Sequence, residues 1–359
     1  DERAHIDAVY TISNEMLGIS EIPAQGRIYK RADDIDATKE NTMDVTTERY
    51  RETFEDMFGR SGDETLQVAF ADNPVGNVTF LNYLPAAVGF TIARLLHFNT
   101  ITMIMFGRWM NALASILLMW IAIRKLPFGK ASFAVFGLFP IILQQIASCS
   151  YDGILLGAVF VYMAYAISLL YSEEKSIEEF GVMFLAGGFC TVACKGGVYI
   201  PLAGVIAMVL WEMFKPLQSK KLNMLLEWQF LFILVFIAQF SQRILSLFMR
   251  QPGSAYRSGE EIYNISYFIE KPNQFIRIFQ NTIVQVGDVH LQEAIGSLLG
   301  RLNIRVPWFI LIGFILLICI CAIRRRDEAV YVKKGHRLFI ALICCASVVL
   351  VLLSMLLSY

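Results

Sequence analysis

The sequence has little charge for its length. Only 17% of its 359 residues are Asp, Glu, Lys or Arg, whereas soluble domains usually carry about 25%. Hydrophobic residues make up 56% of the chain and gather in runs close to the roughly 20 residues that a helix needs to cross a bilayer. A soluble protein is therefore excluded, and the sequence predicts an all-α polytopic membrane protein.

Several familiar signatures are also missing. The seven cysteines lack zinc-ligand spacing with histidine partners, so a zinc site is not indicated. The net charge is zero and there is no polybasic tail, so nucleic-acid binding is not indicated either. No internal repeat is found, which disfavours inverted-repeat transporters. The chain starts inside a polar segment without a signal peptide, and we expect a membrane-spanning helix just before Asp1.

The apolar runs predict about eight transmembrane helices. The run 80–97 is shorter and contains Pro85, and it is predicted to lie at the outer interface with Arg94 and His97 among the lipid headgroups. A polar segment precedes it, because residues 1–78 hold 17 Asp and Glu against 8 Lys and Arg. The predicted spans are 103–123, 131–148, 152–171, 179–195, 197–214, 224–247, 306–323 and 338–358.

The basic connectors predict which side each loop faces. Segments 124–130 and 215–221 carry three Lys or Arg each, and 324–337 carries six, so these connectors are predicted to be cytoplasmic. The acidic amino-terminal segment and the turns near Asp152 and Lys195 then face outward. The chain divides into an outer acidic segment with interfacial helices (1–102), a bundle of about six transmembrane helices (103–247), an outer loop with an amphipathic helix at 271–287 (248–305) and two further transmembrane helices (306–359).

Arg108 and Asn111 lie inside the apolar run 103–123, three residues apart and so on one helix face. An arginine at a helix centre costs about 2.5–3.5 kcal/mol on insertion scales. Arg108 is either an interface anchor whose charge reaches the headgroups, or a cation that holds an anionic group inside the bundle. Gly107, just before it, would let another group approach closely.

Two further polar residues lie at predicted outer turns. Lys195 is either an ordinary helix end whose ammonium reaches the interface, or a cation that neutralises a phosphate. Asp152 follows Tyr151 at the start of a helix. There the backbone dipole favours an acid by about 0.3–1 kcal/mol, so a structural role and a role in a site both remain open.

The first five residues, DERAH, place Asp1, Glu2 and His5 in the first turns of an outer helix. They are either a solvated acidic start with a capping role, or a site in which one carboxylate is a general base and the others orient it or bind a cation. The sequence assigns no cofactor beyond a candidate divalent cation. The predicted site has Asp1, Glu2 and His5 as catalytic residues, and Arg108, Asn111, Tyr151, Asp152 and Lys195 as substrate-binding residues.

Three stretches resemble a known bacterial membrane family, catalogued as domain of unknown function 2142. They are YLPAAVGFTIARLLHFNTITMIMFGRWMNALASILLMWIAIRKLP, LFPIILQQIASCSYDG and CKGGVYIPL. DERAH is similar to that family's D-E-x-x-H motif. SLLGRLNIRVP resembles its glycine-rich segment but lacks the usual tryptophan and aspartate. The arrangement also resembles the C-type membrane glycosyltransferases, such as protein O-mannosyltransferases and aminoarabinose transferases.

The second resemblance implies an enzyme with a polyprenyl-phosphate-linked sugar as donor and a glycan or cell-wall polymer as acceptor. It implies an active site on the outer face of the bacterial cytoplasmic membrane, with membrane lipid around the bundle. Asp1 would take the catalytic place beside Glu2, Asp152 would match an acid of the second outer loop, and Arg108 and Lys195 would hold the donor phosphate. The alternatives are a transporter or flippase, whose path those two cations line, and a non-catalytic scaffold whose acidic segment docks a partner.

Overall fold

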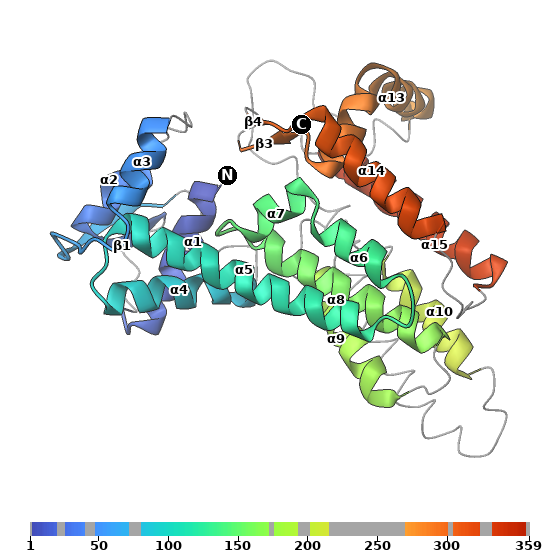
Figure 1. Ribbon diagram of the computed structural model, residues 1–359, viewed down its shortest axis with the longest axis horizontal. Coiled ribbons are helices and arrows are strands. Elements are labelled where there is room, and N and C mark those ends of the chain that lie inside the picture. The colour runs from blue at the N-terminus through green and yellow to red at the C-terminus, as the bar shows by residue number, and fades with distance from the viewer. Residues whose placement is uncertain are drawn as a thin grey trace. The chain divides into compact units, whose positions relative to one another are not determined.

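A computed structural model describes residues 2–19, 26–39, 47–71, 80–171, 176–192, 202–214, 270–300, 304–323 and 332–356. Most of these residues are helical (Figure 1). The chain forms two compact units. The first unit comprises Asp1–Ile121, Ser132–Phe160 and Ile295–Ile318, and the second comprises Ala122–Ala131, Val161–Ala294 and Cys319–Tyr359.

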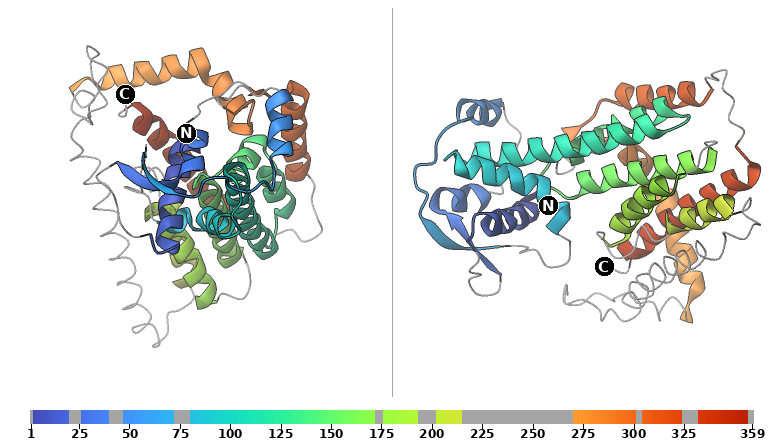
Figure 2. Two further views of the ribbon diagram at one scale, coloured as in Figure 1. Left: turned by 90° about the vertical axis from the view of Figure 1, so that its left-hand side faces the viewer. Right: turned by 90° about the horizontal axis from the view of Figure 1, so that it is seen from below.

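The first unit begins with a small mixed assembly. Helix α1 (Glu2–Met16) packs against α4 (Leu84–Leu95) and contacts strand β1 (Arg27–Arg31). Strand β1 pairs antiparallel with β2 (Leu66–Phe70), and Figure 2 shows the paired strands beside α1. Helix α2 (Ala32–Lys39) contacts both strands, and α3 (Thr47–Glu55) follows it in the chain. The described residues of the acidic amino-terminal segment are therefore folded, with a core between α1, α4 and the strands.

Helix α4 is the predicted interfacial helix. Its 12 residues extend about 18 Å, too short to cross roughly 30 Å of hydrocarbon. Pro85 lies in its first turn, where a missing N–H costs nothing. The expectation for Arg94 was wrong: this side chain is only 7% exposed, donates to Ser13 Oγ at 3.0 Å and lies over the ring of Tyr10. Arg94 is covered because α1 packs on the face of α4 that carries it.

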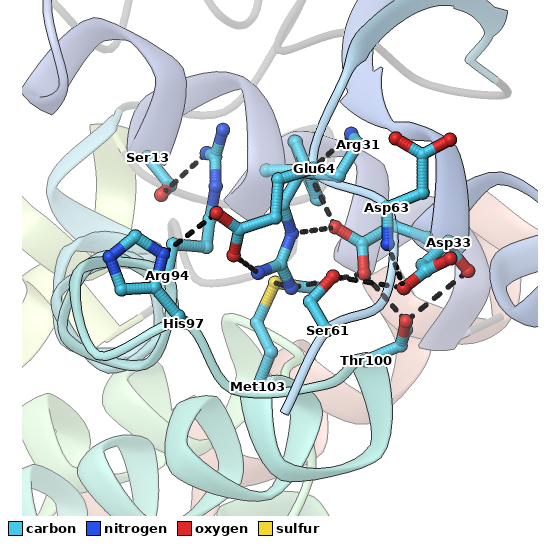
Figure 3. Close-up of polar contacts among 12 residues, drawn as sticks. Ser13, Arg31, Asp33, Ser61, Asp63, Glu64, Arg94, His97, Thr100 and Met103 are labelled. Atoms are coloured by element: carbon cyan, nitrogen blue, oxygen red, sulfur yellow. Dashed lines mark hydrogen bonds and ion pairs between the residues drawn. The ribbon is translucent and has the colours of Figure 1, made fainter. Parts of the chain in front are cut away.

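A buried network of charged side chains ties this assembly to the start of α5 (Thr100–Lys125) (Figure 3). The Asp34 carboxylate accepts hydrogen bonds from Tyr10 Oη at 2.7 Å, Arg31 Nε at 2.7 Å and Thr100 Oγ1 at 2.6 Å. All four residues are buried. Because a buried charge is costly unless it is paired and hydrogen-bonded, these contacts fix the amino-terminal assembly on α5.

Within the described residues, three helices are long and apolar enough to cross a membrane: Thr100–Lys125, Asp152–Tyr171 and Lys334–Val351. The first two are α5 and α8, and the third belongs to α15 (Lys334–Leu356). Helix α8 approaches α5 closely at Gly153 and Gly157, four residues apart. A Cβ at Gly153 would lie 3.0 Å from Ser115 Oγ, and one at Gly157 would lie 2.9 Å from Leu118 Cβ. This small-xxx-small spacing is typical of packed transmembrane helices.

The prediction of one helix over 131–148 was wrong. The structure has two short helices there, α6 (Lys130–Gly137) and α7 (Pro140–Ile146). Pro140 cannot donate the hydrogen bond that would continue α6, and it forces the preceding residue out of the helical region. Phe139 accordingly has ψ 137°.

Three further predicted spans correspond to α9 (Ile177–Val192), α10 (Ala203–Phe214) and α14 (Trp308–Ile323). The remainder of the predicted spans 179–195 and 197–214, residues 193–201, lies outside the described residues, and α14 begins two residues after the start of the predicted span 306–323. The predicted span 224–247 lies outside the described residues. The predicted amphipathic helix at 271–287 corresponds to α13 (Pro272–Ile295), which extends further along the chain.

Each unit has its own apolar core. In the second unit, α9, α10 and α15 pack with the end of α8 around Tyr162, Met183, Val209 and Ile343. In the first unit, Phe139, Ile295 and Leu311 form a smaller cluster. Strand β3 (Leu298–Leu299), paired with β4 (Ile304–Arg305), contacts α7 there.

Candidate functional site

Arg108 of α5 forms a two-pronged ion pair with Glu2 in the first turn of α1. Its Nε donates to Oε1 at 2.8 Å and its Nη2 donates to Oε2 at 2.6 Å. The backbone N–H of Cys149 donates to the same Oε1 at 3.1 Å. Bidentate arginine–carboxylate pairs are among the stronger hydrogen-bonded contacts in proteins. Arg108 is therefore aimed at the amino-terminal helix, and a role as a simple headgroup anchor is disfavoured.

The environment of Glu2 keeps its carboxylate ionised. Burial by itself would raise the pKa of Glu2, but the hydrogen bonds and positive charge of Arg108, together with the Cys149 N–H, outweigh burial and lower the pKa below its ordinary value. An acid with a lowered pKa accepts a proton poorly at neutral pH. Glu2 is thus better suited to neutralising and orienting Arg108 than to acting as a general base.

His5 lies one turn further along α1, on the same face as Glu2. Its Nδ1 is 2.7 Å from Tyr83 Oη, and its Nε2 is 3.4 Å from Ser150 Oγ. The imidazole also meets the ring of Tyr151 edge-on, with centroids 5.3 Å apart. His5 therefore joins α1, the residue before α4 and the turn that precedes α8.

Asp152, the first residue of α8, completes a chain of hydrogen bonds. Ser150 Oγ donates to Asp152 Oδ2 at 3.0 Å and accepts from the Asp152 N–H at 3.2 Å. Burial is the main cause of a raised pKa of the Tyr83 hydroxyl, so this hydroxyl stays protonated. With a neutral imidazole, the network assigns protons in one direction, from Tyr83 to His5 Nδ1, from His5 Nε2 to Ser150 and from Ser150 to Asp152.

Asn111 of α5 holds the turn that carries Cys149 and Ser150. It is fully buried and its Nδ2 donates to the carbonyl oxygens of Ser148 and Ser150, at 2.7 and 2.9 Å. These two bonds fix the turn that presents the Cys149 N–H to Glu2. Gly107 was expected to let a ligand approach closely. In the structure it lets α4 approach α5, because a Cβ at Gly107 would lie 2.4 Å from Phe90 Cε1 of α4.

The structure brings six of the predicted site residues into one connected set of contacts. We call the set the Glu2 cluster, and its members are Glu2, His5, Tyr83, Arg108, Asn111, Cys149, Ser150, Tyr151 and Asp152. The other two predicted residues, Asp1 and Lys195, lie outside the described residues. The catalytic and substrate-binding roles of these residues stay predictions. The structure adds how the six described residues are arranged in space.

Three members of the Glu2 cluster were missed from the sequence. Ser150 carries a usable signal, since a serine just before the first residues of an apolar helix is a common cap. Tyr83 and Cys149 meet His5 and Glu2 only through tertiary packing, with no local pattern to indicate it. In the part of the chain that the structure describes, no group of three or more His, Cys, Asp or Glu could hold a metal ion.

The sequence matches one family model along its whole length, residues 1–359, and that family is described as predicted membrane protein (DUF2142). The chain belongs to the DUF2142 family. The membership predicted from the sequence is thereby confirmed. No curated protein and no solved structure matches the chain. In this DUF2142 protein, two residues of the DERAH motif, Glu2 and His5, are the ones that contact Arg108 and Ser150.

Proposed function

We propose that this DUF2142 protein is a membrane glycosyltransferase. It moves a sugar from a polyprenyl-phosphate donor to an envelope or cell-surface glycan, on the outer face of the bacterial cytoplasmic membrane. The observation that carries the proposal is the contact between Arg108, in a helix long and apolar enough to span a membrane, and the acidic first turn of α1. Beside that contact lies the hydrogen-bonded chain from Tyr83 to Asp152.

The position of Arg108 suits a lipid-linked phosphate. It lies eight residues into α5, about 12 Å along the helix at roughly 1.5 Å per residue. Ionisable residues at such depths are expensive and are kept where they pair with one another or hold a substrate. The tail of a polyprenyl phosphate would lie among the apolar helices, with its phosphate near the interface. The guanidinium matches phosphate oxygens as well as carboxylate oxygens.

The proposed reaction is a displacement at the anomeric carbon. The acceptor hydroxyl oxygen attacks that carbon, the bond from the carbon to the phosphate oxygen breaks, and the hydroxyl proton passes to a carboxylate. Asp1 keeps its predicted role as the base. Arg108 stabilises the charge that grows on the leaving polyprenyl phosphate. Asp152, oriented by Ser150, positions the acceptor hydroxyl.

The test is a donor assay on the purified protein in lipid nanodiscs. A panel of polyprenyl-phosphate sugars is supplied with envelope glycan as acceptor, and the release of free polyprenyl phosphate is measured by mass spectrometry. We expect one donor to be consumed with transfer of its sugar. A panel in which every donor survives intact, with the protein folded, would contradict the proposal. Movement of a donor across a sealed bilayer without cleavage would favour the flippase.

A further inference from the structure

Three N–H donors converge on the Glu2 carboxylate from two fixed elements. Arg108 Nε and Nη2 come from the first half of α5, and the third donor is the backbone N–H of Cys149. A planar guanidinium fork with a backbone N–H is also a donor set for a phosphate group. The contacts that Glu2 receives are therefore those that an external oxyanion would receive at the same place.

Packing and hydrogen bonds hold the elements that carry the donors, and solvent reaches the ion pair that they form with Glu2. Gly107, next to Arg108, is packed against Phe90, and Asn111 holds the carbonyls on either side of Cys149. Glu2 lies in the first described turn of α1. Its side chain is 28% exposed and that of Arg108 is 37% exposed. An ion pair that solvent reaches is weakened by screening, so an incoming anion can compete with it.

We propose that Glu2 is a displaceable internal occupant of an oxyanion site made by Arg108 and the Cys149 N–H. The phosphate of the donor takes its place on binding. This inference rests on the proposed function, because the donor supplies the phosphate. The displaced carboxylate stays on the α1 face that carries His5. In the ligand-free protein the same carboxylate keeps Arg108 neutralised and correctly oriented.

The experiment measures binding of two phosphate probes, farnesyl monophosphate and inorganic phosphate, by calorimetry. The protein is held in phosphatidylcholine nanodiscs, whose zwitterionic lipids add no competing anion. We expect Glu2→Gln to bind farnesyl monophosphate about tenfold more tightly than the wild type, as follows if the pair is closed in about nine of ten molecules. Arg108→Gln should lose binding. Glu15→Gln, an exposed acid of the same helix, should bind like the wild type.

Comparison of the two probes identifies the kind of phosphate that the site binds. Binding by farnesyl monophosphate alone assigns the site to a lipid-linked phosphate, and binding of both probes in the same variant order assigns it to the phosphate group itself. Wild-type or weaker binding in a folded Glu2→Gln protein would overturn the inference and make the pair structural. So would phosphate binding that ignores Arg108→Gln. If no sugar donor is consumed but Glu2→Gln still tightens binding, the transferase fails and the oxyanion site stands.

Discussion

Sugar transfer by Arg108→Gln is expected to fall about 10²–10³-fold, the usual effect of removing one preorganised donor from developing negative charge. The substitution removes the guanidinium that Glu2 orients. The leaving phosphate then lacks the positive charge of Arg108 beside it and two of its N–H donors. The effect should be on kcat/KM, because Arg108 also holds the donor phosphate before the reaction, and it is measured by release of polyprenyl phosphate. Arg108→Lys keeps the charge but not the planar fork and should retain part of the rate.

The matched control is Arg124→Gln, an exposed arginine in the last turn of the same helix. It removes the same charge away from the Glu2 cluster, and transfer should be unchanged. Because Arg108→Gln leaves the Glu2 carboxylate without its partner, the double variant Glu2→Gln/Arg108→Gln guards against misfolding by removing both charges. A folded Arg108→Gln protein with the wild-type rate would remove this residue from the mechanism.

Gly89→Ala is expected to destabilise the first unit by about 3 kcal/mol, at the upper end of ordinary overpacking. A Cβ at Gly89 would lie 2.4 Å from the carbonyl oxygen of Phe106, 2.6 Å from its carbonyl carbon and 2.8 Å from Gly107 Cα. These are backbone atoms of α5, which cannot turn aside as a side chain can, so α4 and α5 must move apart. The measurement is denaturant unfolding in detergent.

The control for Gly89→Ala is Gly181→Ala in α9. Nothing among the described residues lies within 4 Å of a Cβ at Gly181, so the change adds only helix propensity, about 0.5–1 kcal/mol of stabilisation. Moving α4 from α5 also displaces Arg108, the neighbour of Gly107. Transfer should fall in the Gly89→Ala protein even where it remains folded. Equal unfolding free energies for the two alanine variants would show that the α4–α5 contact is looser than described.

Periodicity and charge predicted the best-formed helices well. The bounds of α8, Asp152–Tyr171, coincide with the predicted span 152–171, because a long apolar run between polar turns has only one helical solution. The prediction of a single helix over 131–148 was wrong because it relied on the length of the apolar run and gave too little weight to Pro140. This proline ends α6 and starts α7. About eight spans were predicted, and three candidate spans lie within the described residues.

The site was predicted as a set of residues but not as a set of contacts. Arg108 was singled out because a cation in an apolar run is costly, and Glu2 because it belongs to an acidic motif. That they bind each other across 106 positions depends on how α1 and α5 pack, for which no local pattern exists. Arg94 was misplaced for the same reason, since only tertiary packing puts α1 over its side chain.

Phosphate binding at Arg108 is tested most directly by a structure of the protein with a bound polyprenyl phosphate. We expect phosphate oxygens within hydrogen-bonding reach of the Arg108 guanidinium and the Cys149 N–H, about 2.7–3.2 Å, with the Glu2 carboxylate turned away. A lipid phosphate bound elsewhere, with the Glu2–Arg108 pair intact in its presence, would show that Arg108 does not hold the donor.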